Sequence, residues 1–323
     1  PLKRDSLFNG IVSLENLHLS WKEFKKGKSK KEDVRLFKKD LQKNIFNLHD
    51  ELTNLNYRHA GYFSFYIKDP KLRHIHKACV KDRVLHHAIF RILYPIFDKM
   101  FIFDSYSCRT GKGTHRAIFR LREFFRKASK NNNKTCYVLK CDIKKFFNSI
   151  DQDILLNLIE NKIKDDNVIW LIKIIIKSFP AGLPLGNITS QLFANIYLNE
   201  LDQYVKHDLK TKYYIRYCDD LIIISSDKKF LGKSILAIND FLKNKLRLQL
   251  HPNKVFIKTL ASGIDFLGWV NFYNHRILRK STRKRMFRKL LINSTPETLN
   301  SYFGLIKHGN TYKIRKEIFK IIS

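Results

Sequence analysis

Apolar side chains recur along this chain with two different periods, and each period predicts a kind of local structure. Helical spacing runs through residues 1–57 and returns in 81–97, 116–127, 154–159, 169–179 and 192–207. Dense β-branched and aromatic residues, or residues that alternate between apolar and polar, mark strands at 62–67, 71–76, 137–141, 213–217 and 221–225. This mixture of helices and short strands predicts an α+β fold.

Two of the predicted strands enclose an acidic turn. Residues 213–217 and 221–225 flank Cys218, Asp219 and Asp220, which predicts a tight β-hairpin with both acids at its tip, held out into solvent. Two carboxylates about 4 Å apart repel by roughly 1 kcal/mol in water and by about 4 kcal/mol at an effective dielectric near 20. A bound cation is one explanation for such a turn. The other is that Asp is simply a good turn residue.

A second acid ends a separate apolar strand. Residues 137–141 lead directly into Asp142, and Asp151 then precedes an amphipathic helix. Asp151 has a structural explanation because Asp is a favoured N-cap residue. Asp142 has none, and an acid at the end of a buried strand needs a partner. If these strands share a sheet, the acidic hairpin with Asp219 is the natural candidate.

The charge of the chain points to a polyanionic partner. Lys and Arg number 62 against 29 Asp and Glu, a formal net charge of +33 over 323 residues. Charge alone fits nucleic acid, an anionic membrane or a ribosome, although the 13% aromatic content offers flat surfaces on which bases stack. An AT-rich genome would also raise the Lys content, so part of the excess has a compositional explanation.

Cysteine usage and hydropathy narrow the location. The five cysteines form no CxxC pair and no Cys/His zinc spacing, which is typical of packing residues in a reducing compartment. Lys173 and Lys177 interrupt the longest apolar run, 168–179, so no membrane span is expected. The first residues lead into no apolar signal segment. We therefore expect a cytoplasmic protein.

Two basic segments are candidate phosphate contacts. Alternation places Lys71 and Arg73 on one face of a strand, where they could grip a triphosphate; an ordinary charged surface strand is the alternative. Arg109 and Lys112 lie in a glycine-containing loop that matches neither the P-loop nor the dinucleotide fingerprint, so phosphate or sugar contact there stays open. A third loop, 180–191, has two glycines and two prolines, and its backbone could lie against a ligand.

The order of these features resembles a known family. A strand ending in Asp142, then a Gly/Pro-rich loop with Ser190 and Gln191, then Tyr217-Cys218-Asp219-Asp220 on a hairpin is similar to the palm of reverse transcriptases, over about residues 60–310. The resemblance implies a right-hand polymerase architecture with fingers, a palm built on an antiparallel sheet, and a helical thumb. The expected domains are an N-terminal helical extension (1–57), fingers with part of the palm (58–134), the palm (135–274, with a fingers insertion at about 160–186) and the thumb (275–323).

The resemblance also implies a two-metal mechanism. Asp142, Asp219 and Asp220 are the expected catalytic acids. Asp142 and Asp219, with the backbone carbonyl of Ile143, are expected to hold two Mg²⁺ ions, for which Mn²⁺ could substitute, and Asp220 completes the acidic cluster. The enzyme class is RNA-directed DNA polymerase, a nucleotidyltransferase.

Further positions match the nucleotide-binding residues of the family. Lys71 and Arg73 match the fingers cations that hold the triphosphate, and Phe147 matches the residue that blocks the ribose 2′-hydroxyl. The competing explanation for Phe147 is a core role, which we assign to Phe146. Lys254 matches a lysine that could protonate pyrophosphate; on its own it reads as a surface charge.

The loop before Gln191 indicates a subgroup. Leu185 and Gly186, with Ser190 and Gln191, are similar to the reverse transcriptases of diversity-generating retroelements, as is the segment 301–312. These enzymes copy a template repeat RNA into cDNA with frequent errors opposite adenine. An aliphatic Leu185 in place of the usual Gln removes a polar check on the incoming nucleotide, whose pocket also includes Gly186 and Gln191. The implied partners are template RNA, cDNA, dNTPs and a small basic accessory protein oligomer, in a bacterial or phage-encoded system.

The C-terminal region is strongly basic. Segment 275–289 holds eight Lys or Arg and no acid, and corresponds to the thumb, which contacts the primer–template through phosphates. The expected contacts there are Arg279, Lys280, Arg283 and Lys284, in addition to Arg109 and Lys112. From the end of the sequence at 323, we expect no RNase H or endonuclease domain. The alternatives are another bacterial reverse transcriptase, such as a retron, CRISPR-associated or phage-defence enzyme, or a non-catalytic basic RNA-binding scaffold.

Overall fold

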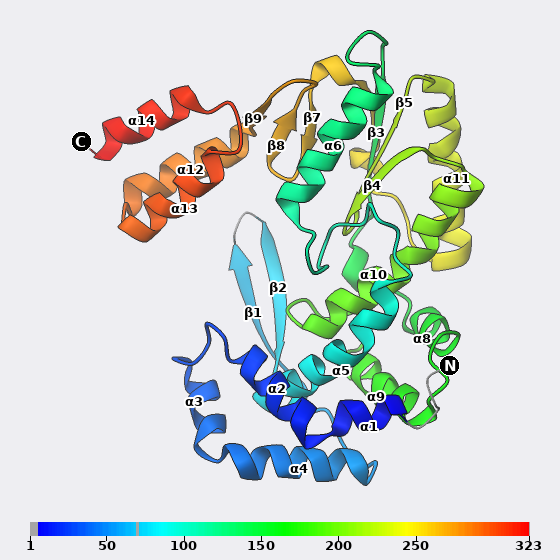
Figure 1. Ribbon diagram of the computed structural model, residues 1–323, viewed down its shortest axis with the longest axis vertical. Helices are drawn as coiled ribbons and strands as arrows, with labels where there is room; N and C mark the ends of the chain where they lie inside the picture. Colours follow the sequence, from blue (N-terminus) through cyan, green and yellow to red (C-terminus); the bar gives the residue numbers. More distant parts are fainter. Residues whose placement is uncertain (1–5, 69–70, 323) are drawn as a thin grey trace.

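The computed structural model describes residues 6–68 and 71–322, and Figure 1 shows its arrangement. The N-terminal helices lie at one end, the C-terminal helices project at another, and a mixed region with the largest sheet joins them. Between the predicted strands 62–67 and 71–76, the pair Asp69-Pro70 is typical of a turn, and these two residues lie outside the described ranges. No helix in the described ranges is long and apolar enough to cross a bilayer.

Four helices form the N-terminal region, as the helical spacing predicts. Buried Leu17 and Trp21 of the second helix and Ile45 and Leu48 of the fourth bring these helices into the core that also contains the long helix α5. The bounds are α1 (Ser6–Val12), α2 (Leu14–Phe24), α3 (Glu32–Lys39), α4 (Leu41–Thr53) and α5 (Val80–Asp98).

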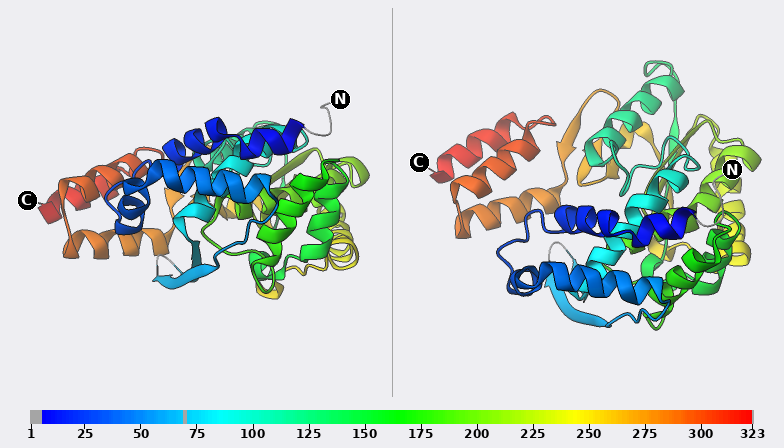
Figure 2. Two further views of the ribbon diagram at one scale, coloured as in Figure 1. Left: turned by 90° about the horizontal axis from the view of Figure 1, so that it is seen from below. Right: turned by 60° about the horizontal axis from the view of Figure 1, so that its bottom comes forward.

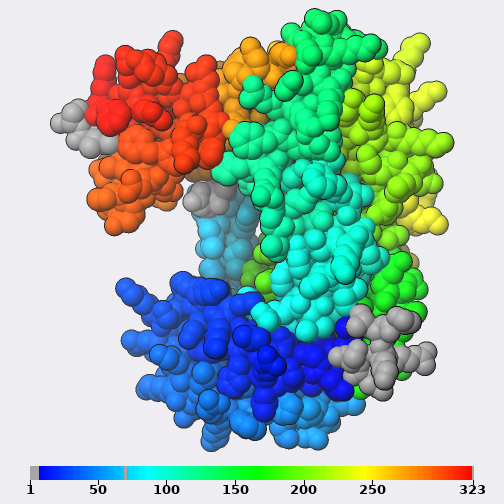
Figure 3. Space-filling model, viewed as in Figure 1, coloured from blue at the N-terminus to red at the C-terminus, as the bar shows by residue number. Residues whose placement is uncertain are grey.

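A two-stranded antiparallel hairpin follows the N-terminal helices. Strands β1 (Tyr62–Lys68) and β2 (Leu72–Ala78) pair so that Ile67 lies opposite Arg73. Its side chains are mostly exposed, and in Figure 3 the hairpin lies at the back of the hollow between the N-terminal and C-terminal helices. Helix α6 (Thr114–Ala128) comes next in the chain after α5.

The central sheet has four strands in the order β4-β5-β3-β6. Its side chains alternate between two cores: Leu139 and Cys141 of β3 belong to the core with α5, α10 and α11, whereas Val138 packs in a core with α6. The sheet is therefore covered on both faces, which explains its near-continuous apolar runs. The strands are β3 (Tyr137–Asp142), β4 (Tyr213–Tyr217), β5 (Asp220–Ser225) and β6 (Phe256–Thr259).

Among the helices around this sheet, α8 begins where the sequence predicts. Asp151 caps α8 by accepting hydrogen bonds from the backbone N–H groups of Asp153 and Ile154, both at 3.0 Å. The remaining elements here are α7 (Phe146–Ser149), α8 (Gln152–Glu160), α9 (Asp166–Lys177), α10 (Ile188–Gln203), a π-helical turn (Tyr204–Asp208), α11 (Lys228–Leu246), and 3₁₀ turns at Pro252–Lys254 and Leu260–Ser262.

A second small sheet leads to the C-terminal helices. Strands β7 (Ile264–Phe266), β8 (Trp269–Asn271) and β9 (Arg276–Leu278) are antiparallel, and α12 (Lys280–Ile292), α13 (Pro296–Ile306) and α14 (Tyr312–Ile322) pack on one another. The start of the basic segment 275–289 is thus strand rather than helix. Figure 2 shows these three helices projecting from the rest of the molecule at the end away from α8 and α9.

Candidate active site

The acidic turn is a tight hairpin, as predicted, but its acids are not held out into solvent. Tyr217 pairs with Asp220, so Cys218 and Asp219 form the turn itself and Asp220 is the first residue of β5. Cys218 takes a left-handed backbone conformation with φ of 56°. The Asp220 side chain is only 21% exposed. The expectation of solvated acids is wrong because the Asp219 and Asp220 residues are only partly exposed and Lys140 pairs with Asp220.

Asp142 meets the hairpin across the sheet. The register of β3 and β5 places Asp142 directly opposite Asp220, so both carboxylates project from the same face at neighbouring positions. The backbone N–H of Ile143 donates to the carbonyl of Asp219 at 3.2 Å, which fixes the turn against the end of β3. Asp142 and Asp219 are 77 positions apart in the sequence, and the sheet brings them together.

Two lysines neutralise part of this charge. Lys254 Nζ lies 2.8 Å from Asp142 Oδ1, and Lys140 Nζ lies 2.9 Å from Asp220 Oδ2. Lys254 is thus more than a surface charge. The other oxygen of Asp220, Oδ1, is buried and has no hydrogen-bond partner among the described residues. A buried carboxylate oxygen without a donor is costly, and it leaves a coordination position open.

The carboxyl groups are also electrostatically strained. Burial, followed by repulsion from Asp142, raises the pKa of Asp219 above its ordinary value. Burial raises the pKa of Asp220 to about 6 even though Lys140 acts in the opposite direction. Both shifts have the sign expected for carboxyl groups that are taken out of water, with repulsion from the neighbouring acids acting in the same direction.

The donor set suits a hard divalent cation. Carboxylate oxygens are the preferred ligands of such ions, and Asp220 Oδ1 is an unpartnered one. Within the described ranges no three His, Cys, Asp or Glu side chains already converge around one point. Lys254 occupies one oxygen of Asp142, so a cation that uses this oxygen has to displace the ammonium group.

Sequence reasoning missed Arg216, which holds the turn from inside. Its guanidinium is fully buried and bonds Asp202 on α10 at 2.6 to 2.9 Å. It also donates to Asn195 Oδ1 and to the carbonyl of Cys218, both at 3.2 Å. Burial alone would lower the pKa of Arg216, but the charge of Asp202, its hydrogen bonds to the guanidinium and smaller contributions from Tyr214 and Cys218 together make the net direction upward. The available signal in the sequence was a charged residue, Arg216, among the apolar and aromatic residues of the predicted strand 213–217.

The candidate triphosphate residues lie on the exposed hairpin. Arg73 is exposed on β2, and Lys71 is exposed just before that strand. The hairpin is tied to the loop of the subgroup signature: His76 N–H donates to the carbonyl of Leu185 at 2.9 Å. Asn187 Nδ2 donates to the carbonyl of His76 at 3.0 Å. The structure thus brings the two nucleotide-binding segments of the sequence analysis together.

The loop residues Leu185, Gly186 and Asn187, which are hydrogen-bonded to β2 through Leu185 and Asn187 and are called the strap below, have little room around them. Gly186 has a positive φ of 114°, and a Cβ there would come within 2.9 Å of Ile75 on β2. Asn187 is buried, and its Oδ1 has no partner in the described chain. Leu185 itself is half-buried, and Gln191 is exposed on α10. A polar side chain at position 185 would therefore lie beside backbone groups that are already hydrogen-bonded to β2.

Phe146 and Phe147 divide the two roles that the sequence offered. Phe146 is buried in the core, while Phe147 is half-buried and packs edge-on against it with ring centroids 5.4 Å apart. The carbonyl of Phe147 accepts from Leu183 N–H at 2.8 Å, and a Cβ on Gly182 would collide with that carbonyl. Only glycine allows this approach, and it fixes the position of Phe147.

The interpretation of Arg109 as a nucleic-acid contact is wrong. Its side chain is 6% exposed, bonds Asp98 at 2.7 Å and donates to the carbonyls of Ile102 and Ser105. Its Nη2 also donates to the carbonyl of Asp98 at 3.3 Å, so the guanidinium is held by internal bonds rather than presented to a ligand. Lys112 is also engaged, with Nζ 2.8 Å from the Phe103 carbonyl and 3.4 Å from the centre of its ring.

The basic C-terminal residues divide into paired and unpaired ones. Arg279 forms an ion pair with Asp265, and Arg283 forms one with Glu317. Lys280 and Lys284 are exposed, and neither makes an ion pair in the part of the chain that the structure describes. Of the four expected thumb contacts, Lys280 and Lys284 are therefore the two without an ion pair in the described ranges.

Comparison with known proteins decides the family. The family model described as "Reverse transcriptase (RNA-dependent DNA polymerase)" matches residues 67–270, which contain all three acids, the hairpin β1–β2 from its Ile67 onward and Lys254. The chain belongs to the reverse transcriptase family. The assignment to the RNA-directed DNA polymerases is thereby confirmed, and enzymes of this family use divalent metal ions.

Individual reverse transcriptase relatives are distant. The chain is 24% identical over 312 residues to protein YkfC of Escherichia coli, covering 83% of this chain and 79% of that protein. It is 25% identical over 304 residues to the group II intron-encoded protein LtrA of Lactococcus lactis, covering 71% of this chain and 49% of LtrA. The chain therefore spans most of YkfC but about half the length of LtrA.

Solved structures support the fold. Telomerase from Candida tropicalis with a fragment of telomeric RNA superimposes with a TM-score of 0.53 at 14% identity, covering 82% of this chain and 55% of that one. Apo telomerase from the same organism gives a TM-score of 0.52 at 15% identity, covering 72% and 52%. The right-hand polymerase fold expected from the sequence is confirmed.

Proposed function

We propose that this chain copies an RNA template into DNA at a site formed by Asp142, Asp219 and Asp220, and that it does so with low fidelity in a diversity-generating retroelement. The observation that carries the catalytic part is the register that sets Asp142 opposite Asp220, with Asp219 bonded to Ile143 in the adjoining turn. Acids from distant parts of the chain share one end of one sheet. A scaffold without catalysis would have no use for this concentration of partly buried negative charge.

Asp142, Asp219 and Asp220, with the backbone of Ile143, would hold divalent ions, which we take to be Mg²⁺ with Mn²⁺ as a substitute. When bound, such ions lower the pKa of a primer 3′-hydroxyl and stabilise charge on the transferring phosphate. Lys254, which lies 2.8 Å from Asp142, would donate a proton to the departing pyrophosphate.

The nucleotide is held from the fingers side. Lys71 and Arg73 are exposed on the hairpin and would contact the triphosphate. Phe147, fixed by the close approach of Gly182, would exclude a ribose 2′-hydroxyl and so select deoxynucleotides. The template is RNA in this proposal; the telomerase relative of known structure was solved with an RNA fragment, and the net charge of +33 supports a polyanionic partner.

Low fidelity follows from Leu185. Its half-buried side chain lies on the loop whose backbone is tied to β2. An aliphatic group there offers no hydrogen bond by which a correct base pair could be recognised, so discrimination against mismatches is weaker. The expected consequence is frequent misincorporation opposite adenine, with the cDNA diversifying a target gene together with a small basic accessory oligomer.

Primer extension tests the catalytic part. With a defined RNA template, an annealed primer, dNTPs and Mg²⁺, the purified chain should synthesise DNA. Asp219→Asn should lower the rate by at least about 10³-fold because one ionised ligand is lost. Glu160→Gln, a change of the same kind at the exposed end of α8, should leave the rate unchanged. Equal rates for Asp219→Asn and Glu160→Gln would sink the catalytic assignment.

Sequencing of the cDNA tests the subgroup. Leu185→Gln should reduce misincorporation opposite template adenines, and Leu185→Met, which keeps an apolar side chain of similar volume, should not. An error spectrum that stays the same in Leu185→Gln would contradict the proposed origin of low fidelity. Paired repeats in the flanking DNA that differ at adenines would separate this system from other bacterial reverse transcriptases.

A further inference from the structure

A pocket with a volume of about 310 Å³ opens where three separate segments meet. Helix α6 contributes Ile118 and Arg122, and the loop between α13 and α14 contributes residues 307–310. The β8–β9 hairpin contributes Asn271, Phe272 and residues 274–276. We name it the junction pocket. Its lining includes none of the catalytic or nucleotide-binding residues considered above and none of the expected thumb contacts.

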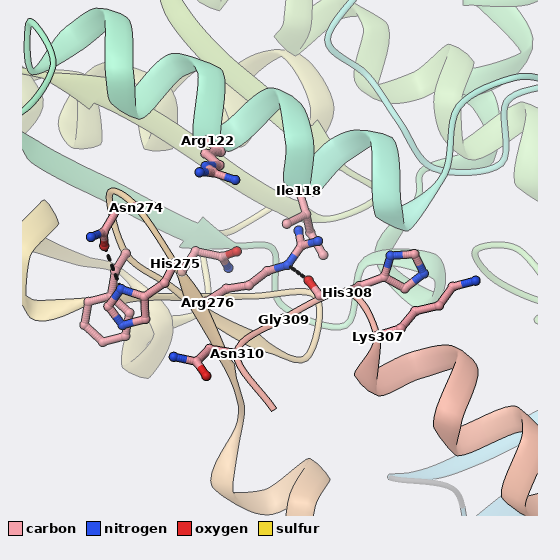
Figure 4. A pocket seen from close by; sticks show the side chains of 11 residues that line it. Ile118, Arg122, Asn274, His275, Arg276, Lys307, His308, Gly309 and Asn310 are labelled. Atoms are coloured by element: carbon pink, nitrogen blue, oxygen red, sulfur yellow. Dashed lines mark hydrogen bonds between the residues drawn. The ribbon is translucent and has the colours of Figure 1, made fainter. Parts of the chain in front are cut away.

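The junction pocket concentrates positive charge without a counter-charge. Arg122, Arg276 and Lys307 line it together with His275 and His308, and none of its lining residues is acidic. Figure 4 shows Arg276 across the middle, with Arg122 above it on α6, His308 and Lys307 to one side and His275 to the other. Arg122 and Lys307 make no ion pair or side-chain hydrogen bond within the described ranges. Like charges held together without an acid favour a bound anion.

The crowding also acts on the groups themselves. Burial, followed by the charge of Arg122, lowers the pKa of Arg276, and burial with His115, Arg276 and Lys307 lowers the pKa of His308. Both directions mean that the positive form is disfavoured as the pocket stands. An anion among these groups would relieve that repulsion.

The pocket is rigidly built. Arg276 donates through Nε to the carbonyl of His308, and its own carbonyl accepts from Asn310 N–H at 2.8 Å. The Arg276 guanidinium also lies 5.4 Å from the ring of Trp269. Gly309 packs so closely on Trp269 that any Cβ would collide with its ring. The loop 307–310 is therefore fixed to β9 before any ligand arrives.

Flat rings flank the cations on both sides. Phe272 and His275 stack with ring centroids 4.6 Å apart and planes 8° apart. On the other side, His115 and His308 lie with ring centroids 4.0 Å apart. One histidine of each pair is exposed: His115 on α6 and His275 in the β8–β9 turn. Cations between exposed rings are the combination that binds single-stranded nucleic acid, where phosphates meet the charges and bases meet the rings. An acidic peptide would use the charges but not the rings.

We propose that the junction pocket binds a backbone phosphate of single-stranded RNA that lies outside the primer–template duplex. The choice of RNA rests on the proposed function, in which this chain copies an RNA. Because the pocket joins α6 of the palm side to the loop between the C-terminal helices, a strand held there ties those helices to the palm while the active site works on another part of the same molecule.

The test compares charge reversal in the pocket with charge reversal elsewhere. Arg122→Glu/Lys307→Glu changes two exposed residues that have no partner to lose in the described chain, so the fold should persist. Lys233→Glu/Lys245→Glu makes the same change of net charge on exposed positions of α11. Thermal unfolding of the full chain should show the same midpoint for wild type and both variants. Arg276 is left intact because it is part of the architecture.

Binding of a labelled single-stranded RNA of about 20 nucleotides is followed by fluorescence anisotropy over a series of KCl concentrations. The pocket variant should bind about tenfold more weakly, and the slope of log Kd against log salt should fall by about 0.7, the value expected for the loss of one phosphate contact to a single strand. The α11 variant should stay within about twofold of wild type. If the two variants have the same affinity and slope, the proposal is overturned.

A second arm separates RNA from free phosphate compounds. Pyrophosphate is added at constant ionic strength, and thermal unfolding is measured. Stabilisation of wild type but not of the pocket variant, with unchanged RNA affinity, would assign the pocket to a free phosphate compound and overturn the RNA proposal. Primer extension on a preannealed duplex is run in parallel. Failure of every protein to extend would refute the proposed function, while the anisotropy comparison would still decide the pocket.

Discussion

Replacing Asp202 with Asn removes the carboxylate that neutralises Arg216 behind the acidic turn. Both side chains are fully buried, and the shape of the site is retained by the amide. Unit charges about 4 Å apart at an effective dielectric near 20 attract by about 4 kcal/mol. Removing one partner of a buried pair costs about 3 to 5 kcal/mol because the other charge stays buried. We therefore expect Asp202→Asn to lower the free energy of unfolding by about 3 to 5 kcal/mol.

The effect on activity has a structural route. Arg216 also donates to the carbonyl of Cys218, so a guanidinium that reorients takes a hydrogen bond away from the turn that carries Asp219. Misplaced reacting groups lose rate steeply, and we expect primer extension per folded molecule to fall by at least about tenfold. Stability is measured by urea unfolding, and extension is measured at a temperature where the variant stays folded.

An exposed pair provides the control. Arg247 is 71% exposed and bonds Asp151 at 2.7 Å, and Arg247→Gln removes that ion pair. Exposed pairs contribute less than about 1 kcal/mol, so this variant should unfold almost as wild type does and extend primers at the same rate. If Asp202→Asn loses no more stability than Arg247→Gln, the buried pair does not support the turn and the reasoning is refuted.

Two further predictions concern the fingers side. Burial, with smaller contributions from His59, His87 and Arg83, lowers the pKa of His86 to about 3, whereas an unfolded His titrates near about 6.5. The folded state thus keeps His86 neutral. Its contribution to the free energy of unfolding is complete above about pH 6.5 and is lost as the pH falls toward about 3. The loss is about 2 kcal/mol by pH 5. Urea unfolding at pH 7 and pH 5 should show this loss in wild type and in His207→Gln at an exposed site, but a smaller loss in His86→Phe; equal losses would contradict it. Asn187→Ala removes the side-chain bond to β2, worth about 1 kcal/mol, and should raise the KM for dNTPs roughly fivefold; an unchanged KM, measured by steady-state extension, would show that the strap does not position the nucleotide.

Local pattern was sufficient where one segment determines its own structure. The two strands around Asp219 are dense in β-branched and aromatic residues, and Asp151 is a preferred N-cap, so the hairpin and the start of α8 follow from their own sequences. The pairing of Asp142 with the hairpin needed the further assumption of a shared sheet. The register confirms that the strands are neighbours and adds which acid is opposite, Asp220.

Burial could not be read from residue type. Arg216 and Arg109 both look like surface cations in the sequence, yet both are buried beside an Asp from another part of the chain, Asp202 and Asp98. The ion pair of Lys254 with Asp142 joins residues 112 positions apart. Such contacts depend on tertiary packing, which periodicity does not encode. The same limit explains why the acids were expected in solvent.

The central claim is that Asp142 and Asp219 serve one divalent-ion site, and ion binding tests it most directly. Mn²⁺ bound to the full chain is measured by electron paramagnetic resonance, with a primer that lacks a 3′-hydroxyl and the matching dNTP, so that no turnover is needed. Asp142→Asn and Asp219→Asn should each weaken Mn²⁺ binding by at least about tenfold, since each removes an ionised oxygen ligand, while Glu160→Gln should bind as wild type does. Wild-type affinity in either of the first two variants would contradict the account.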